Sequence, residues 1–339
     1  YHSMKRMELC RAVGSMEQLA YVREVRDLAS GQRLVEVENG RLRFTVLPDR
    51  GLDIASLRFD GKNMSFMAKA GLQHEKTTDI LGGLFFTCGP DNVGPAENGL
   101  PMHGSFRNTN AEHLGTEAFW RDSQYVLRIR GSLRCATLFG SNIALRRTIE
   151  TVYGSPSLMV QDELVNEGFT PHPLMLLYHI NAGFPLLCEG TRAEIPCGAV
   201  FSRDTGRPVP NEAWETMPAP QDNAPEQVYY HEGLTGEVRL RVRPPAGGAA
   251  LVVRYSADSL PVLTQWISPA SGAYAMGLEP GTCHVQGLSG EKKRRCHYQY
   301  DLSFHPNPPF LSDASHRFLL FSYHKQSSMQ SIHRPVNVL

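Results

Sequence analysis

Two polar side chains interrupt a segment that is otherwise apolar on both faces. The run from Leu174 to Ile180 is of strand length, and His179 and Asn181 break one of its faces. A run that is apolar on both faces is typical of a strand covered on both sides. A histidine can take up and release a proton near neutral pH. We therefore interpret His179 as a candidate functional residue, with a core histidine whose hydrogen bonds are satisfied as the alternative.

A carboxylate ends a track that carries almost no side chains. In the segment that runs from Tyr274 to Glu279, Ala275, Gly277 and Glu279 share one face of the predicted strand. Such a track leaves room for a ligand or for the close approach of another backbone. Glu279 is therefore a second candidate, although a carboxylate just before Pro280 could also cap a turn.

The segment from Gly82 to Gly104 is rich in Gly and Pro, has almost no periodicity, and is predicted to be a long loop. Long structureless segments inside compact domains are usually functional. This one carries Asp91 and His103, and Arg107 follows it closely. A second long loop, 202–226, is predicted to be a lid or a crossover.

The elements that must position these residues are mostly strands. The 30 Gly and 23 Pro leave little room for helices, and short segments of alternating apolar and polar residues recur along the chain. Strands are predicted at 42–46, 125–130, 143–149, 158–165, 237–243, 251–255, 298–304 and 317–323. Helical spacing occurs only over Ser15–Asp27, where Met16, Leu19 and Ala20 share one side. The sequence thus predicts an all-β fold with a short peripheral N-terminal helix.

Charge and cysteine content exclude several classes of protein. The 339 residues contain 34 Lys+Arg and 34 Asp+Glu, so that no net positive charge favours nucleic acid or an anionic membrane surface. No apolar run approaches the roughly 18 residues that span a bilayer. The seven cysteines are scattered without a Cys-x-x-Cys pair and indicate neither a zinc site nor a disulfide framework. We expect a reducing, cytoplasmic environment.

The pattern predicts one main domain. Residues 1–3 are interpreted as a vector remnant, and residues 4–33 as an N-terminal extension that contains the predicted helix. Residues 34–324 are predicted to form a single β-sandwich catalytic domain. The polar residues 325–339 are predicted to be a tail outside it.

Four segments, taken in order, resemble the aldose 1-epimerase (galactose mutarotase-like) superfamily, and above all its uncharacterised bacterial aldose-epimerase-like branch. They are Pro48-Asp49-Arg50-Gly51-Leu52-Asp53-Ile54, Leu100-Pro101-Met102-His103-Gly104, Tyr178-His179-Ile180-Asn181 and Gly277-Leu278-Glu279-Pro280-Gly281-Thr282. The similarity runs from about Leu34 to Tyr323. It implies a large antiparallel β supersandwich that uses no metal and no organic cofactor.

The resemblance also implies roles for the candidates. Glu279 would be the base that takes the proton from the C1 hydroxyl of an aldose, and His179 the acid that protonates the ring oxygen. The ring then opens and closes again on its other face. Each positioned proton-transfer group typically contributes about 10²- to 10⁴-fold. His103 would bind the ring oxygen or a neighbouring hydroxyl, and Arg107 a hydroxyl or an anionic substituent.

Three weaker candidates complete the predicted sugar contacts: Asn181, Asp91 and Trp266. Trp266 could stack on the apolar face of a sugar, and a buried core tryptophan is the alternative. For His103 the alternative is a merely exposed loop side chain. Arg50 and Asp53 both fit the first motif. We interpret them as a structural turn pair that fixes an early hairpin.

One departure from the family leaves the substrate open. Characterised galactose mutarotases carry an Asn-Arg loop before the first histidine, and the corresponding residues 91–95 contain no arginine. The sugar could be a different aldose, an acidic one or a modified one. We expect a cofactor-independent carbohydrate epimerase or mutarotase, with a catalytically silent carbohydrate-binding protein on the same scaffold as the alternative. A cupin-like metal enzyme is disfavoured because the 13 histidines lack metal-ligand spacing.

Overall fold

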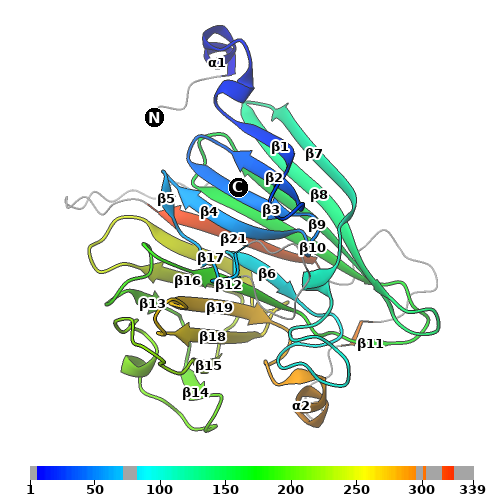
Figure 1. The fold of residues 1–339 in the computed structure, drawn as a ribbon, viewed down its shortest axis with the longest axis vertical. Helices are drawn as coiled ribbons and strands as arrows, with labels where there is room; N and C mark the ends of the chain where they lie inside the picture. Colours follow the sequence, from blue (N-terminus) through cyan, green and yellow to red (C-terminus); the bar gives the residue numbers. More distant parts are fainter. Residues whose placement is uncertain (1–5, 72–81, 295–300, 303–314, 324–339) are drawn as a thin grey trace.

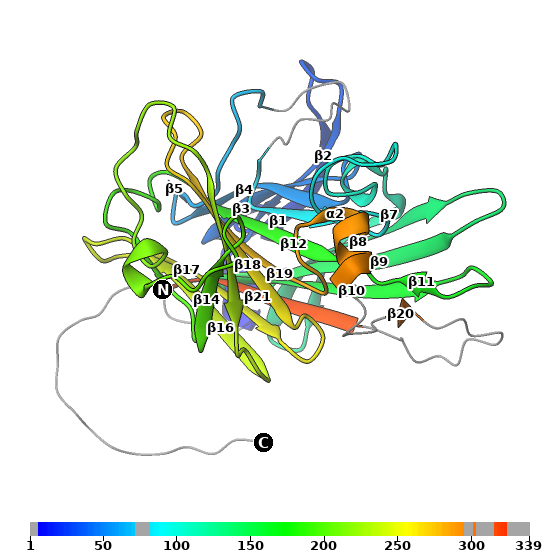
Figure 2. The same cartoon turned by 90° about the horizontal axis from the view of Figure 1, so that it is seen from below.

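Two large antiparallel sheets pack face to face in the computed structural model (Figures 1 and 2). The structure describes residues 6–71, 82–294, 301–302 and 315–323. The main apolar core contains buried side chains from both sheets, such as Phe44 and Tyr178 from the first and Leu145 and Val253 from the second. The all-β sandwich predicted from the sequence is confirmed.

Within the described residues, the first sheet has the order β1 (Tyr21–Arg26), β2 (Arg33–Glu38), β3 (Leu42–Leu47), β4 (Asp53–Phe59), β6 (Phe85–Cys88), β12 (Leu177–Ala182), β19 (Ala275–Gly281), β18 (Val262–Ser268), β15 (Gln227–Glu232) and β14 (Ala199–Ser202), and β5 (Lys62–Asn63) pairs with β4. The second sheet has the order β13 (Arg192–Glu194), β16 (Glu237–Arg243), β17 (Ala250–Ser256), β21 (Ser315–Tyr323), β10 (Ser157–Asn166), β9 (Asn142–Val152), β8 (Gln124–Ala136) and β7 (Glu112–Arg121). A small ladder joins β11 (His172–Pro173) to β20 (Asp301–Leu302), and the helices are α1 (Arg6–Ala12), α2 (Gly287–Arg294) and the 3₁₀ turns η1 (Met16–Gln18), η2 (Phe106–Asn108) and η3 (Asn211–Ala213).

The burial of each strand follows its sequence pattern. Strand β10 alternates between partly buried and buried residues along its whole length, as expected of a strand with one face on the core. Strands β12 and β19 are buried at every position. The prediction that Leu174–Ile180 is covered on both faces is therefore confirmed. Because side chains alternate along β12, Tyr178 faces the main core while His179 and Asn181 face the other side of the sheet.

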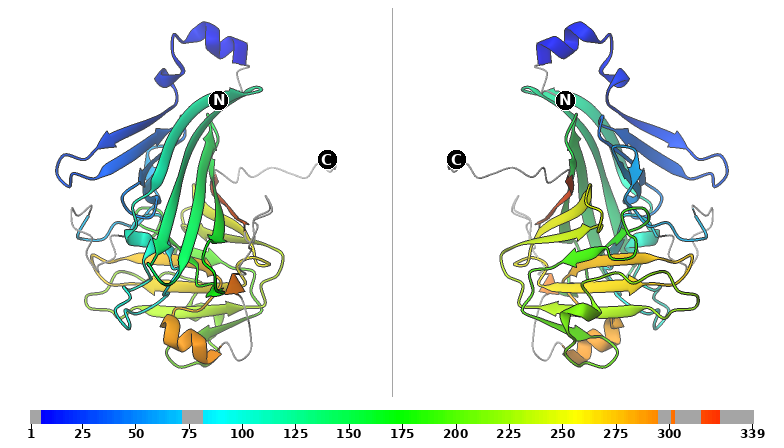
Figure 3. Two further views of the ribbon diagram at one scale, coloured as in Figure 1. Left: turned by 90° about the vertical axis from the view of Figure 1, so that its right-hand side faces the viewer. Right: turned by 90° about the vertical axis from the view of Figure 1, so that its left-hand side faces the viewer.

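The helix predicted over Ser15–Asp27 is wrong. Only η1 is helical there, and the segment continues as β1, in which all six residues pair with β2. Aromatic and β-branched side chains such as Tyr21 and Val22 favour a strand, and pairing with β2 outweighs the helical spacing of the apolar residues. The peripheral helix is α1 instead, at one end of the molecule (Figure 3), where its Arg6 lies over the ring of Trp120 on β7.

The predicted long loop over Gly82–Gly104 contains a central strand. Strand β6 lies between β4 and β12, and its four residues are all buried. A strand this short and buried on both faces shows no alternation, which is why periodicity missed it. Of the strands predicted near the C-terminus, 317–323 is confirmed by β21, and 298–304 lies largely outside the described residues, as do residues 1–3 and 325–339.

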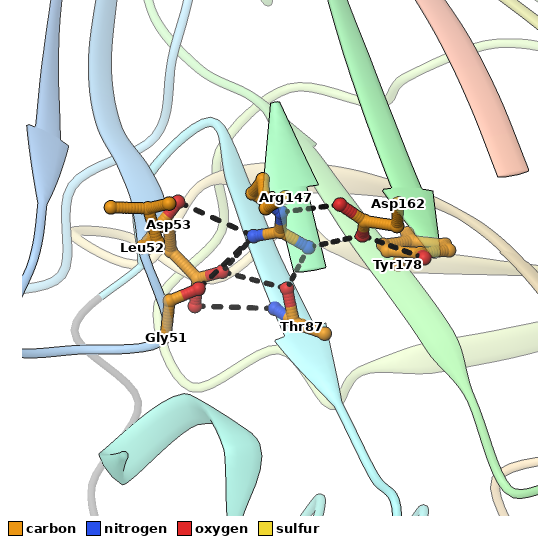
Figure 4. A network of polar contacts seen from close by, with 7 residues as sticks. All are labelled: Gly51, Leu52, Asp53, Thr87, Arg147, Asp162 and Tyr178. Carbon is orange, nitrogen blue, oxygen red and sulfur yellow. Dashed lines mark hydrogen bonds and ion pairs between the residues drawn. The ribbon is translucent and has the colours of Figure 1, made fainter. Parts of the chain in front are cut away.

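A buried arginine joins the two sheets (Figure 4). Arg147 on β9 is fully buried, and its Nε and Nη2 donate to the two carboxylate oxygens of Asp162 on β10 at 2.8 and 2.6 Å. Its Nη1 lies 3.1 Å from Oδ1 of Asp53 on β4, and Nη2 donates to the hydroxyl of Thr87 on β6 at 2.8 Å. Tyr178 on β12 donates its hydroxyl proton to Asp162 at 2.8 Å. We call these five residues the Arg147 network.

The network explains the first family-like motif. Arg147 Nη1 also donates to the backbone carbonyls of Gly51 and Leu52 at 3.1 and 3.3 Å, in a turn where both residues have positive φ. The backbone N–H of Asp53 donates to the carbonyl of Arg50 at 3.1 Å. The predicted turn is present, but the carboxylate of Asp53 is bound to Arg147 and Thr87. Its role is to dock the turn onto the second sheet.

No helix among the described residues has the length and apolar character needed to cross a membrane.

Candidate active site

A cavity of about 360 Å³ lies on the face of the first sheet that His179 and Asn181 share. This volume is in the range of small-molecule sites. Its lining combines a polar cluster with apolar walls: Phe66, Ala68, Gly82, Gly94, Pro95, Met102, His103, His179, Asn181, Arg203, Glu226, Val228, Trp266, Ala273, Glu279 and Val285. Five of the residues predicted from the sequence meet here, namely Glu279, His179, His103, Asn181 and Trp266.

The imidazole of His179 and the carboxylate of Glu279 are in direct contact. They project from the neighbouring strands β12 and β19, whose register sets Asn181 opposite Gly277. Nε2 of His179 lies 2.9 Å from Oε1 of Glu279, and the two side chains are only 7% and 3% exposed. The contact is not aligned as a hydrogen bond, so Oε1 retains its capacity to accept one.

The small residues before Glu279 make room for this pair. A Cβ atom on Gly277 would lie 2.8 Å from both Oε1 of Glu279 and Cε1 of His179, closer than carbon atoms normally approach. A larger residue at this position would therefore have to displace the carboxylate, the imidazole or both. The space predicted from the track of missing side chains is filled by the two functional groups themselves.

The polar cluster contains buried atoms whose hydrogen bonds are unmade. Among the described residues, no partner is present for Nδ1 of His103, Nδ1 of His179, Oδ1 of Asn181 or Oε1 of Glu279. The amide nitrogen of Asn181 donates to the carbonyl of Gly83 at 3.1 Å, which fixes its free oxygen toward the cavity. Buried polar atoms without partners are uncommon and costly in folded proteins. Four of them at one cavity indicate a site for a polar ligand.

His103 is held by its backbone in a strained conformation. Its φ is +61°, its N–H donates to the carbonyl of Gly94, and its carbonyl accepts from Gly89, both at 2.9 Å. Burial, together with the nearby His179 and Arg107, lowers the pKa of His103 to about 3. Its imidazole is therefore neutral at physiological pH, with one nitrogen able to donate and the other to accept.

Aromatic rings fix the orientation of His179. The ring of Phe86 stacks on the imidazole at 4.4 Å between centroids, with 19° between the planes. Trp266 meets the same imidazole edge to face at 5.6 Å, and His103 does so at 5.9 Å. Trp266 is partly exposed and lines the cavity, so it is not the buried core tryptophan of the alternative interpretation.

Two charged residues of the cavity were not found from the sequence. Arg203 directly follows β14 and Glu226 directly precedes β15, so that they lie at the two ends of the long loop between these strands. Nη1 and Nη2 of Arg203 donate to Oε1 of Glu226 at 3.3 Å, and Nε1 of Trp266 donates to Oε2 at 2.9 Å. The loop 202–226 was predicted to be a lid or a crossover, but no spacing in the sequence indicated that its two ends lie close together.

Two predicted residues are not brought to the cavity. The carboxylate of Asp91 accepts hydrogen bonds from the backbone N–H and the hydroxyl of Ser105, and it stabilises the loop. Arg107 lies in η2, is 7% exposed, and lines a separate cavity of about 30 Å³ together with Arg50 and Asn108. Arg107 is buried in the tight 3₁₀ turn η2. The residues around Arg107 carry no helical signal, so this turn could not be predicted from the sequence.

No metal-binding cluster of three or more His, Cys, Asp or Glu occurs in the part of the chain that the structure describes. What the cavity does contain is a carboxylate and an imidazole in contact, with further hydrogen-bonding groups beside them. That set can move protons between the oxygens of a bound ligand.

The fold has relatives among solved structures. A candidate aldose 1-epimerase from Klebsiella pneumoniae is 22% identical with a TM-score of 0.75, and the match covers 91% of this chain and 88% of that one. A galactose mutarotase-like protein from Clostridium acetobutylicum is 13% identical with a TM-score of 0.62, covering 91% and 100%. A candidate aldose 1-epimerase from Escherichia coli is 12% identical with a TM-score of 0.57, covering 90% and 100%.

These similarities show that the chain has the galactose mutarotase-like fold, as the sequence motifs predicted. Comparison with curated proteins gives no match. A family model does match residues 29–299, which is most of the chain. The chain belongs to the family described as Domain of unknown function (DUF4432).

Proposed function

We propose that this protein is a carbohydrate isomerase that interconverts the two anomers of an aldose without a metal or organic cofactor. The observation that carries the proposal is the pairing of His179 with Glu279 at 2.9 Å in a cavity where four buried polar atoms lack partners among the described residues. A base and an acid in contact, surrounded by free hydrogen-bonding groups, match a substrate with a hydroxyl next to a ring oxygen. The fold of the structural relatives is consistent with this chemistry.

The reaction proceeds by ring opening. Glu279 takes the proton from the C1 hydroxyl while protonated His179 gives its proton to the ring oxygen. The bond between C1 and the ring oxygen breaks as the C1 carbonyl forms. After rotation about the C1–C2 bond, the C5 hydroxyl attacks the other face of the carbonyl. Its proton returns to His179, and Glu279 returns the first proton to the C1 oxygen.

The remaining groups of the cavity bind and orient the sugar. Neutral His103 hydrogen-bonds the ring oxygen or a neighbouring hydroxyl, and Oδ1 of Asn181 accepts a hydrogen bond from a further hydroxyl. Trp266 lies against the apolar face of the sugar. Asp91 and Arg107 have no direct contact with the substrate in this proposal.

Two substitutions test the proton-transfer roles. Glu279→Gln keeps the shape of the side chain and removes its basicity, and His179→Gln removes the acid. We expect each to lower the rate of anomer exchange by about 10²-fold or more, with sugar affinity changed far less. The rate is measured by NMR exchange or polarimetry over a panel of aldoses. Treatment with EDTA is expected to leave the rate unchanged.

The matched control is Glu237→Gln, which neutralises an exposed carboxylate on the second sheet and is expected to keep the wild-type rate. If the wild type accelerates no aldose while calorimetry detects sugar binding, the protein is a silent carbohydrate-binding protein and the enzymatic proposal fails. Loss of exchange on removing a tightly bound metal would contradict the cofactor-free mechanism.

A further inference from the structure

The end of the cavity beyond Glu279 has its own recognition elements. Along the sheet, the strands follow in the order β12, β19, β18, β15. His179 lies on β12 and Glu279 on β19. The next two strands carry Trp266 on β18 and Val228 on β15, which pair with each other. Arg203 and Glu226 flank β15. If the ring oxygen of the sugar lies at His179 and its C1 hydroxyl at Glu279, the carbons beyond C1 point toward this end. The inference below rests in this respect on the proposed function.

Glu226 is the centre of this end. Its Oε2 accepts from the indole of Trp266 at 2.9 Å, and its Oε1 accepts from Arg203 at 3.3 Å. Trp266 also meets the ring of Phe66 edge to face at 6.4 Å. One carboxylate therefore fixes a stacking surface and a hydrogen-bond donor of the cavity at the same time. Its side chain is 51% exposed, so solvent and ligands can reach it.

Among the described residues at this end, carboxylates outnumber cations. The guanidinium of Arg203 is bound not only by Glu226 but also by Asp204, whose Oδ1 accepts from Nε at 2.7 Å. Two carboxylates thus surround one guanidinium, and Glu279 adds a third carboxylate within the same cavity. An anionic group on the sugar would have to approach Arg203 next to two like charges, which costs binding free energy. Hydroxyl groups, by contrast, can donate to Glu226 and accept from Arg203.

We propose that Glu226 is a specificity-determining residue, which positions Arg203 and Trp266 for an uncharged sugar and rejects sugars that carry a sulfate or phosphate on the carbons beyond C1. The missing arginine of residues 91–95 left acidic sugars open as substrates. Among the described residues, the arginine that lines the cavity, Arg203, is already paired with two carboxylates, and apolar Val228 lies beside Trp266. Both features favour a neutral ligand.

The test uses pairs of sugars that differ only at C2 or C3, on the carbons beyond C1. Galactose and galactose 2-sulfate form one pair, and glucose is compared with both glucose 3-sulfate and glucose 3-phosphate. For the wild type we expect a kcat/KM for anomer exchange at least tenfold higher for the better uncharged sugar than for its charged partners. Glu226→Gln keeps an acceptor for Trp266 and removes the charge. In this variant, the ratio of kcat/KM for the uncharged sugar to kcat/KM for its charged partner is expected to fall by about tenfold. The charged sugars should have a lower KM, and the uncharged one a few-fold higher KM.

A role that is only structural would lower both rates and leave the ratio unchanged, and that result overturns the proposal. Glu232→Gln is the matched control, because this exposed carboxylate ends the same strand outside the cavity, and its ratio should equal that of the wild type. If wild type accelerates charged sugars as well as uncharged ones, the inference is wrong while the proposed function stands. If no sugar is accelerated, the proposed function fails, and the same pairs measured by calorimetry decide the selectivity: preference for uncharged sugars supports the inference, and equal or reversed affinities overturn it.

Discussion

The Arg147 network and the polar cluster at the cavity lie on opposite sides of strand β12, and they differ in whether their buried polar groups have hydrogen-bond partners. Tyr178, which faces the core, donates to Asp162 within a set of groups that all have partners. The next residue, His179, faces the cavity, where its Nδ1 and Oε1 of Glu279 lack a partner among the described residues. One strand thus carries a closed network on one face and an open cluster on the other.

The difference separates stability from function. A fully satisfied network in a medium of low dielectric constant holds its parts in one arrangement, and Arg147 ties strands β4, β6 and β12 of the first sheet to β9 and β10 of the second. Unsatisfied groups cost free energy of folding, and sites of binding or catalysis commonly carry such a cost. We infer that the network fixes the position of β12, so that the open cluster can keep its groups ready for a ligand.

The largest expected effect comes from opening the closed network. Arg147→Met leaves the buried carboxylates of Asp162 and Asp53 without their cation. Burial alone would lower the pKa of the Arg147 guanidinium, but these two carboxylates raise it overall, a sign of how strongly the folded state favours the charged form. We expect the free energy of unfolding to fall by about 3–5 kcal/mol. Denaturant unfolding measures the change.

The neighbouring arginine is the control for that variant. Arg146 is 51% exposed and pairs with Glu163 and Glu167 at the surface. Because exposed ion pairs contribute little, Arg146→Met should cost less than about 1 kcal/mol. Equal losses for the two variants would show that the network has no special role in stability.

A smaller effect distinguishes a satisfied histidine from an unsatisfied one. His231 is 3% exposed, with Nε2 lying 3.0 Å from Oε1 of Gln265 and Nδ1 lying 3.3 Å from Sγ of Cys197. Burial lowers its pKa to about 4, although the contact with Gln265 raises it slightly. Below pH 6.5 the unfolded chain binds the proton and the folded chain does not, so stability falls as the pH falls from 6.5 toward 4. At pH 5 this loss is about 2 kcal/mol.

His231→Gln should remove this part of the difference in unfolding free energy between pH 7 and pH 5. His103 titrates in the same direction, because burial lowers its pKa to about 3. Only His103 lies at the cavity, so a saturating sugar should alter the contribution of His103 and leave that of His231 unchanged. A pH dependence that is identical in wild type and His231→Gln would contradict the assignment.

The sequence predicted those parts of the molecule whose structure is visible in a local pattern of residues. Strands with one face on the core, such as β16, alternate visibly, and the confirmed range 237–243 follows from that alternation. His179 and Glu279, which line one cavity, were predicted as candidates because each breaks an apolar or small-residue pattern. The helix over Ser15–Asp27 was wrong because its segment is decided by a partner strand, and pairing between strands is not a local property.

The parts that could not be predicted depend on residues that the fold brings together from afar. Arg147 and Asp53 are 94 positions apart, and Arg203 and Glu226 are 23 apart. No periodicity connects such residues, because their contact follows from the packing of two sheets and from the closure of a long loop. Arg107 illustrates the converse, since this residue is close to His103 in the chain but lies in a 3₁₀ turn and lines a different cavity.

The smallest expected change in stability belongs to the most direct test, which compares two adjacent residues on one strand. Tyr178→Phe removes one hydrogen bond to a buried carboxylate and should cost about 1.5 kcal/mol of stability, with anomer exchange kept within a few-fold of wild type. His179→Gln keeps a polar group next to Glu279 and should change stability by less than about 1 kcal/mol, while exchange falls by about 10²-fold or more. Denaturant unfolding and NMR exchange on the same two variants give all four numbers. If both variants lost stability and activity together, the two faces of β12 would form one coupled unit, and the division between a closed network and an open cluster would be wrong.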